Sequence, residues 1–179
     1  MKRFIILLIF ISSLISCLSD DSLQEITVEN RYSISIPSFL KKAHDLNDDA
    51  SLQYQHIFRE FYVIVIDEPK SELKKALDDN NLTEFYSNDI EGYFDLLFND
   101  FEQGVSAFRK SNLIDTLINN MPAKLLTVLG TVEDIDIFYY LAYIEGEKRY
   151  YQIMAWTLAS REHQYKEKMR KIIYSLKEL

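Results

Sequence analysis

Residues 136–158 read DIFYYLAYIEGEKRYYQIMAWTL, two long apolar runs separated by a short polar segment. Both runs are rich in aromatic residues, which favour strands. The segment between them, Glu145–Lys148, is typical of a hairpin turn in which Gly146 could adopt a positive φ. Because each run is apolar at consecutive positions, we expect other layers to cover this hairpin on both faces.

Four further strands are predicted upstream of the hairpin. Tyr32–Ile36 alternates apolar and polar residues and stops at Pro37. Leu52–Gln55 alternates in the same way, whereas Phe61–Ile66 is apolar throughout, as in a central strand. Lys124–Thr131 precedes the hairpin and completes the set.

Helical spacing marks the segments between and after these strands. A short helix capped by Ser71 is expected over 71–78, and a long acidic helix capped by Ser87 over 87–108. A shorter helix is expected around 112–118. The chain should close with a basic helix capped near Ser160, whose apolar stripe is Tyr165, Met169, Ile172, Ile173 and Leu176.

This order of elements predicts the fold class. Strands joined by tight hairpins, rather than by alternating helices, favour a largely antiparallel sheet. Helices on both of its faces would give an α/β/α sandwich of the mixed α+β class. No repeat or break in composition divides residues 25–179, so we predict a single domain there.

Composition excludes several classes of protein. The 179 residues include 20 Lys+Arg and 28 Asp+Glu, and this acidic balance argues against nucleic-acid binding. The single cysteine excludes an intrachain disulfide and a zinc site built from several thiolates. Four glycines leave little material for a phosphate-binding loop. We therefore predict no cofactor and no metal site.

The N-terminal segment predicts export from the cytoplasm. Lys2 and Arg3 precede the apolar run Phe4–Ile15. A helix of that length spans about 18 Å, against roughly 30 Å for a bilayer core, so a signal peptide fits better than a membrane-spanning helix.

The end of this segment, Leu14–Cys17, resembles the lipobox of bacterial lipoproteins. The resemblance implies cleavage between Ser16 and Cys17, and attachment of diacylglycerol to the Cys17 thiol together with acyl chains such as palmitate. Residues 1–16 would then be the signal peptide and 17–24 the lipidated N-terminus and tether. An ordinary secretory signal that happens to contain a cysteine is the alternative. Leu18 is not aspartate, which favours the outer membrane, facing the periplasm or the cell surface.

The domain resembles the PsbP-like superfamily. The resemblance lies in Tyr32–Pro37 (YSISIP), Ala50–Tyr54 (ASLQY), Phe61–Ile66, Tyr150–Thr157 (YYQIMAWT) and Ile172–Leu176 (IIYSL). The superfamily includes extrinsic photosystem II proteins and bacterial lipoproteins of the DcrB type. Membership implies a compact sandwich that binds or assembles other molecules and carries no catalytic motif.

No arrangement of residues predicts catalysis. The chain lacks Gly-x-Ser-x-Gly. His44 and His163 are expected on the surface and His56 at a strand end. No two of these histidines lie within four residues of each other, so no helix or strand is predicted to present a pair of histidine metal ligands. Asp48-Asp49 is expected in a turn, and Asp134 and Asp136 are expected on one exposed strand face. The aromatic set Tyr139, Tyr140, Tyr143, Tyr150, Tyr151 and Trp156 is expected to fill two cores.

The sequence therefore predicts a non-enzymatic lipoprotein of the bacterial cell envelope, anchored through Cys17, that binds or helps to assemble an envelope protein partner. Two alternatives remain open. A small-ligand carrier would need an apolar pocket of at least ~300 Å³, and a lipid-anchored hydrolase would need a polar cleft with perturbed carboxylates. The basic final helix could also contact anionic headgroups, and the acidic helix a cationic partner.

Overall fold

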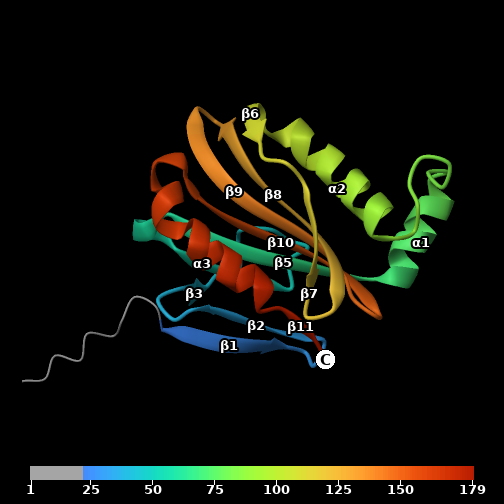
Figure 1. The fold of residues 1–179 in the computed structure, drawn as a ribbon, viewed down its shortest axis with the longest axis horizontal. Helices are drawn as coiled ribbons and strands as arrows, with labels where there is room; N and C mark the ends of the chain where they lie inside the picture. The colour runs from blue at the N-terminus through green and yellow to red at the C-terminus, as the bar shows by residue number, and fades with distance from the viewer. Residues whose placement is uncertain (1–21) are drawn as a thin grey trace, which may run out of the picture.

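The computed structural model describes residues 22–179, so Ser16, Cys17 and the predicted signal peptide lie outside the described part (Figure 1). Within it, eight strands form an antiparallel sheet in the order β3-β4-β5-β10-β9-β8-β6, and β7 also pairs with β8. These strands are β3 (Lys41–Lys42), β4 (Leu52–His56), β5 (Phe61–Pro69), β6 (Ser106–Lys110), β7 (Ile114–Ile118), β8 (Met121–Val132), β9 (Ile135–Glu145) and β10 (Arg149–Leu158). The predicted antiparallel sheet is confirmed.

The hairpin β9–β10 supplies both cores, as its two-sided apolar sequence predicts. Tyr140 and Ile153 enter the core on one face, whereas Tyr139 and Tyr143 enter the core on the other. The expectation for Gly146 is wrong, because no glycine among the described residues has a positive φ. Its small size matters for another reason: a Cβ at this position would lie 2.6 Å from the Glu178 carboxylate.

Helix α3 (Glu162–Tyr174) covers one face of the sheet. Four residues of its predicted apolar stripe are buried against the strands: Tyr165, Met169, Ile172 and Ile173. The fifth, Leu176, lies just past the end of the helix and is buried in the same core. The predicted cap is wrong. The chain leaves β10 through a 3₁₀ turn, η2 (Ala159–Arg161), so Ser160 lies inside that turn and no side chain caps either element.

A second, three-stranded sheet lies beside α3 and was not predicted as a separate layer (Figure 1). It contains β1 (Leu23–Val28), β2 (Tyr32–Pro37) and β11 (Lys177–Glu178), in the order β1-β2-β11. Tyr32, Ile34 and Ile36 of β2 are fully buried in the α3-side core. The alternation in β2 was predicted, but its partners lie at the two ends of the described chain.

The opposite face is covered by α1 (Lys70–Asp79) and α2 (Ile90–Gly104). Both caps differ from the prediction. α1 follows directly on β5, so Pro69 occupies its N-cap position and Ser71 lies inside the helix. Asp89 caps α2 by accepting from the Gly92 N–H (3.0 Å), while the Ser87 hydroxyl donates to Asp89. Lys124 holds the start of α2 through an ion pair with Glu91 (2.8 Å).

Two predicted helical stretches are strands. α2 ends at Gly104, and residues 106–110 pair as β6 with the far half of β8. Residues 114–118 pair as β7 with the near half of β8, where a short helix was predicted. The reason is the unpaired edge of β8, whose backbone groups both segments satisfy.

Candidate ligand groove beneath helix α2

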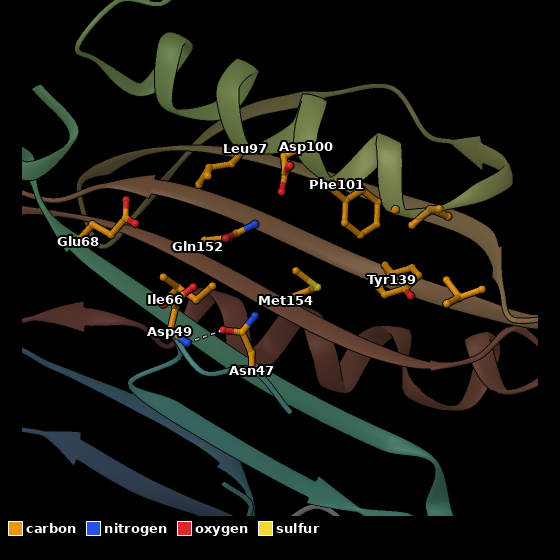
Figure 2. A pocket seen from close by; sticks show the side chains of 13 residues that line it. Asn47, Asp49, Ile66, Glu68, Leu97, Asp100, Phe101, Tyr139, Gln152 and Met154 are labelled. Carbon is orange, nitrogen blue, oxygen red and sulfur yellow. Dashed lines mark hydrogen bonds between the residues drawn. The ribbon is translucent and has the colours of Figure 1, made fainter. Parts of the chain in front are cut away.

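A groove of about 450 Å³ lies between the C-terminal half of α2 and the sheet (Figure 2). Its walls come from the 43–51 loop, β5, α2 and the strands β8 to β10. The lining residues are Asn47, Asp49, Ile66, Glu68, Leu97, Asp100, Phe101, Gly104, Val105, Val132, Tyr139, Gln152 and Met154. The volume meets the requirement set above for a small-ligand carrier.

Local geometry explains why these side chains converge. Ile66 and Glu68 are two residues apart on β5 and therefore share a face of the sheet. Gln152 is the register partner of Ile66 on β10. On α2, Leu97, Asp100, Phe101 and Gly104 have the i, i+3, i+4, i+7 spacing of one helical face. Figure 2 shows Asp100 pointing from α2 toward the sheet.

The floor of the groove is apolar and ordered by ring contacts. Phe101 meets Tyr139 edge to face, with 5.2 Å between the ring centroids. Ile66, Leu97 and Met154 complete an apolar surface among the lining residues. At the rim, a Cβ built on Gly104 meets no atom within 4 Å. A larger side chain at position 104 therefore has space beside the groove.

The charged groups of the lining are all acidic. Asp49, Glu68 and Asp100 contribute carboxylates, and no lysine, arginine or histidine is among the lining residues. Burial, followed by the charges of Glu72 and Asp49, raises the pKa of Glu68. The groove therefore combines a negative potential with an apolar floor, which favours a ligand that is apolar and positively charged.

A firmly held loop brings Asp49 to the groove. The buried side chain of Gln53 accepts from the N–H groups of Leu46 (2.8 Å) and Asn47 (3.2 Å), and donates to the Asn47 carbonyl (2.6 Å). The Asp49 N–H donates to Asn47 Oδ1 (2.9 Å). The predicted turn at Asp48-Asp49 is confirmed. Its place in the groove could not be predicted, because the groove exists only after distant segments assemble.

The histidines lie where the sequence predicts. His44 and His163 are exposed, and His56 ends β4 and accepts from the Arg59 N–H (3.3 Å). No group of three possible metal ligands is found within residues 22–179. The prediction that Asp134 and Asp136 share one strand face is wrong. Asp134 lies in the β8–β9 turn with a φ of 65°, whereas Asp136 lies in β9.

The aromatic set fills the two cores as predicted. Five of its six members are buried tyrosines, and Trp156 is half-buried, stacked on Tyr62 with 5.2 Å between centroids. Another cluster missed by sequence reasoning has a structural role. The fully buried Asp67 carboxylate forms ion pairs with Arg149 (2.5 Å) and Arg31 (3.2 Å), which joins β5 and β10 to the turn after β1.

The fold is similar to solved structures. No protein-family model matches the chain, and no curated protein is significantly similar to it. The solution structure of cyanobacterial PsbP (CyanoP) from Synechocystis has a TM-score of 0.60 and 13% identity, covering 91% of this chain and 96% of that chain.

LpqN, described as involved in cell envelope biogenesis of Mycobacterium tuberculosis, has a TM-score of 0.55 and 9% identity. The match covers 89% of this chain and 92% of that chain. Identities this low establish the architecture and nothing beyond it. The predicted resemblance is confirmed at that level: this chain has a PsbP-like fold.

Proposed function

We propose that this chain is a non-enzymatic binding module of a bacterial cell envelope, anchored by lipid on Cys17, and that the groove beneath α2 is its ligand site. The observation that carries the proposal is the groove itself, an apolar floor bordered by Asp49, Glu68 and Asp100 without a basic residue. The ligand would be an apolar molecule or segment with a positively charged group.

Two further observations support this proposal. The segment Leu14–Cys17 has the residues that lipoprotein processing requires. LpqN, whose fold is similar, is described as involved in cell envelope biogenesis.

Within residues 22–179, no helix has the length and apolar content needed to span a bilayer.

The lining of the groove favours binding over catalysis. Catalysis through a serine, cysteine or lysine nucleophile needs that side chain within reach of a base. The lining residues include carboxylates, amides and a tyrosine, but no serine, cysteine, lysine or histidine. A raised carboxyl pKa is a feature of some hydrolases. Here burial, followed by the charges of Glu72 and Asp49, raises the pKa of Glu68, and the acidic and apolar lining suits the recognition of a cation.

Mass spectrometry of the protein isolated from bacterial membranes tests both parts of the proposal. Under denaturing conditions, the peptide that begins at Cys17 should carry diacylglycerol and acyl chains, and the Cys17→Ala variant should carry neither. Under native conditions, wild type should retain a bound molecule that is lost from the Glu68→Gln/Asp100→Asn double variant.

A bulky substitution gives an independent check of the site. Gly104→Phe would occupy space at the rim and should also lose the bound molecule, while unfolding at a temperature close to that of wild type. An unmodified Cys17 would contradict the anchor. A ligand retained equally by wild type, the double variant and Gly104→Phe would contradict the groove as the site.

A further inference from the structure

Exposed apolar side chains gather at the end of the molecule where the chain emerges from residue 22. The 3₁₀ turn η1 (Ile57–Arg59) joins β4 to β5 and leaves Phe58 90% and Ile57 60% exposed. Leu23, the first residue of β1, is 55% exposed. Figure 1 shows the starts of β1, β5 and α3 at this same end of the molecule.

A continuous series of contacts links residue 22 to this turn. The Ser38 N–H donates to the Ser22 carbonyl (2.9 Å), and the two serine hydroxyls are hydrogen-bonded. The next residue, Phe39, lies under the Arg59 guanidinium at 4.3 Å and has its ring 5.8 Å from that of His56. The His56 and Phe58 rings are 6.4 Å apart. These contacts therefore fix the position of Phe58 relative to Ser22, the first residue that the structure describes.

Hydrogen bonds hold the turn that presents Phe58. The Arg59 N–H donates to His56 Nδ1 (3.3 Å), and the Glu60 N–H donates to the Ile57 carbonyl (3.0 Å). Arg161, from η2, donates to the Phe58 carbonyl (3.3 Å). An ordered turn thus holds Phe58 in an exposed position, although exposing a phenylalanine side chain to water is unfavourable relative to burying it.

Basic residues surround these apolar side chains. Arg59 belongs to the turn and Arg161 contacts it. Lys41 and Lys42 are exposed on the short edge strand β3, where Lys41 pairs with Gln55, next to His56. Among nearby acids, Glu60 accepts a hydrogen bond from Tyr62 (2.8 Å), and Glu162 is paired with Lys166 (2.8 Å).

We infer that this end of the domain rests on an anionic phospholipid surface. Phe58, Ile57 and Leu23 would enter the membrane interface, while the four bases named above contact the headgroups. Aromatic side chains favour that interface, and each base near an anionic surface adds to the attraction. We call these seven residues the tether-end surface.

The inference rests on the proposed lipidation of Cys17, because a lipid anchor there would hold the domain next to a phospholipid surface. Five residues, Leu18–Ser22, separate Cys17 from β1. Fully extended, they reach roughly 20 Å. A domain held that close meets the bilayer at a high effective concentration, so weak interfacial contacts suffice to orient it. The tether's own acids, Asp20 and Asp21, are fewer than the bases of the tether-end surface.

A single fluorescent reporter tests this orientation. Cys17 is the only cysteine, so once it is lipidated, Phe58→Cys supplies the one free thiol for an environment-sensitive dye. The matched control is Phe85→Cys. Phe85 is a 74% exposed phenylalanine in the α1–α2 connection, at the opposite end of the molecule (Figure 1). Both variants would be prepared as the lipidated protein in phosphatidylcholine vesicles with and without phosphatidylglycerol.

The expected result is a blue shift and loss of quenching by aqueous iodide at position 58 only, stronger with phosphatidylglycerol. Equal spectra and equal quenching at positions 58 and 85 would overturn the inference. The vesicles contain no other protein, so protection of the dye at position 58 from iodide reports contact with lipid.

A second measurement separates this inference from the anchor. If mass spectrometry finds no lipid on Cys17, the proposed anchor fails, and flotation with phosphatidylglycerol vesicles then compares wild type with Phe58→Ser and Phe85→Ser. A roughly tenfold weaker binding of Phe58→Ser alone, as expected for one aromatic anchor, would support the tether-end surface. Equal binding of all three proteins would contradict it.

Discussion

Asp89 shows how one carboxylate sets the start of α2. Hydrogen bonds from the Ser87 hydroxyl and from the Gly92 N–H lower its pKa. Gly92 is required beside it, because a Cβ at this position would overlap the Ser87 carbonyl. Sequence reasoning placed the cap at Ser87, since serine and aspartate are equally good caps and only the backbone geometry separates them.

We expect Asp89→Ala to lower the free energy of unfolding by about 0.5–2 kcal/mol, the usual loss for an N-cap. Ser87→Ala should cost less, because the Gly92 N–H keeps its acceptor. Since the folded pKa is lowered, this stabilisation is present above the ordinary aspartate pKa and is lost as pH falls through the folded pKa. Urea unfolding of both variants at neutral and acidic pH measures this. A larger loss in Ser87→Ala would show that the cap is misassigned.

Glu68 makes stability depend on pH in the opposite direction from Asp89. Its raised pKa means that the folded protein holds this proton more tightly than the unfolded chain. Stability should therefore fall as pH rises from the ordinary glutamate pKa through the raised one. Glu68→Gln should be more stable than wild type at pH 7 and should lose that pH dependence, whereas Glu25→Gln on exposed β1 should behave as wild type. Thermal unfolding between pH 4 and pH 8 measures this difference, and a wild-type profile in Glu68→Gln would contradict the role of the groove's acids.

At the scale of elements, the sequence predicts the helices and strands whose formation depends on local apolar spacing. The apolar residues of Tyr32–Ile36 and of the α3 stripe are buried as their spacing predicts, although β2 is not half-buried, because Ser33 between them is buried as well. Residues 106–110 and 114–118 were predicted as helical because apolar spacing in short segments is ambiguous. Their strands depend on the edge of β8, which is a long-range partner that no local pattern encodes.

The two-residue strand β11 is another element that only tertiary contacts explain. The Glu178 carboxylate accepts from the N–H groups of Glu147 (2.5 Å), Lys148 (3.2 Å) and Arg149 (3.2 Å), and from the Tyr151 hydroxyl (3.0 Å). This one side chain joins the small sheet to the β9–β10 turn.

Glu178→Ala should therefore lower the free energy of unfolding by about 1–3 kcal/mol, because the hydroxyl of buried Tyr151 and the half-buried Arg149 N–H lose their acceptor. Glu147→Ala, which removes an exposed side chain from the same turn, should change it by less than about 0.5 kcal/mol. Chemical denaturation of the two variants measures the contrast. Similar values for both would show that Glu178 does not join the sheet to the turn.

At the scale of the whole molecule, the sandwich could be predicted and the groove could not. The groove takes residues from a loop, a helix and several strands that are far apart in sequence. Individual signals existed, such as the acids of α2 and the glutamate that follows the apolar run of β5. Only the topology shows that Asp49, Glu68 and Asp100 lie around one apolar floor, because the relative position of α2 and the 43–51 loop is a property of the assembled layers.

Isothermal titration calorimetry with two amphiphiles of equal chain length tests the central claim most directly. An alkyltrimethylammonium, below its micelle concentration, should bind wild type at pH 7. It should bind roughly fivefold or more weakly to Glu68→Gln/Asp100→Asn, since 1 kcal/mol corresponds to about a fivefold change. Its affinity should fall as acid protonates Glu68, and the matching alkyl sulfate should bind poorly throughout. Equal binding of the two amphiphiles, or equal affinity in wild type and the double variant, would contradict a cation-selective groove.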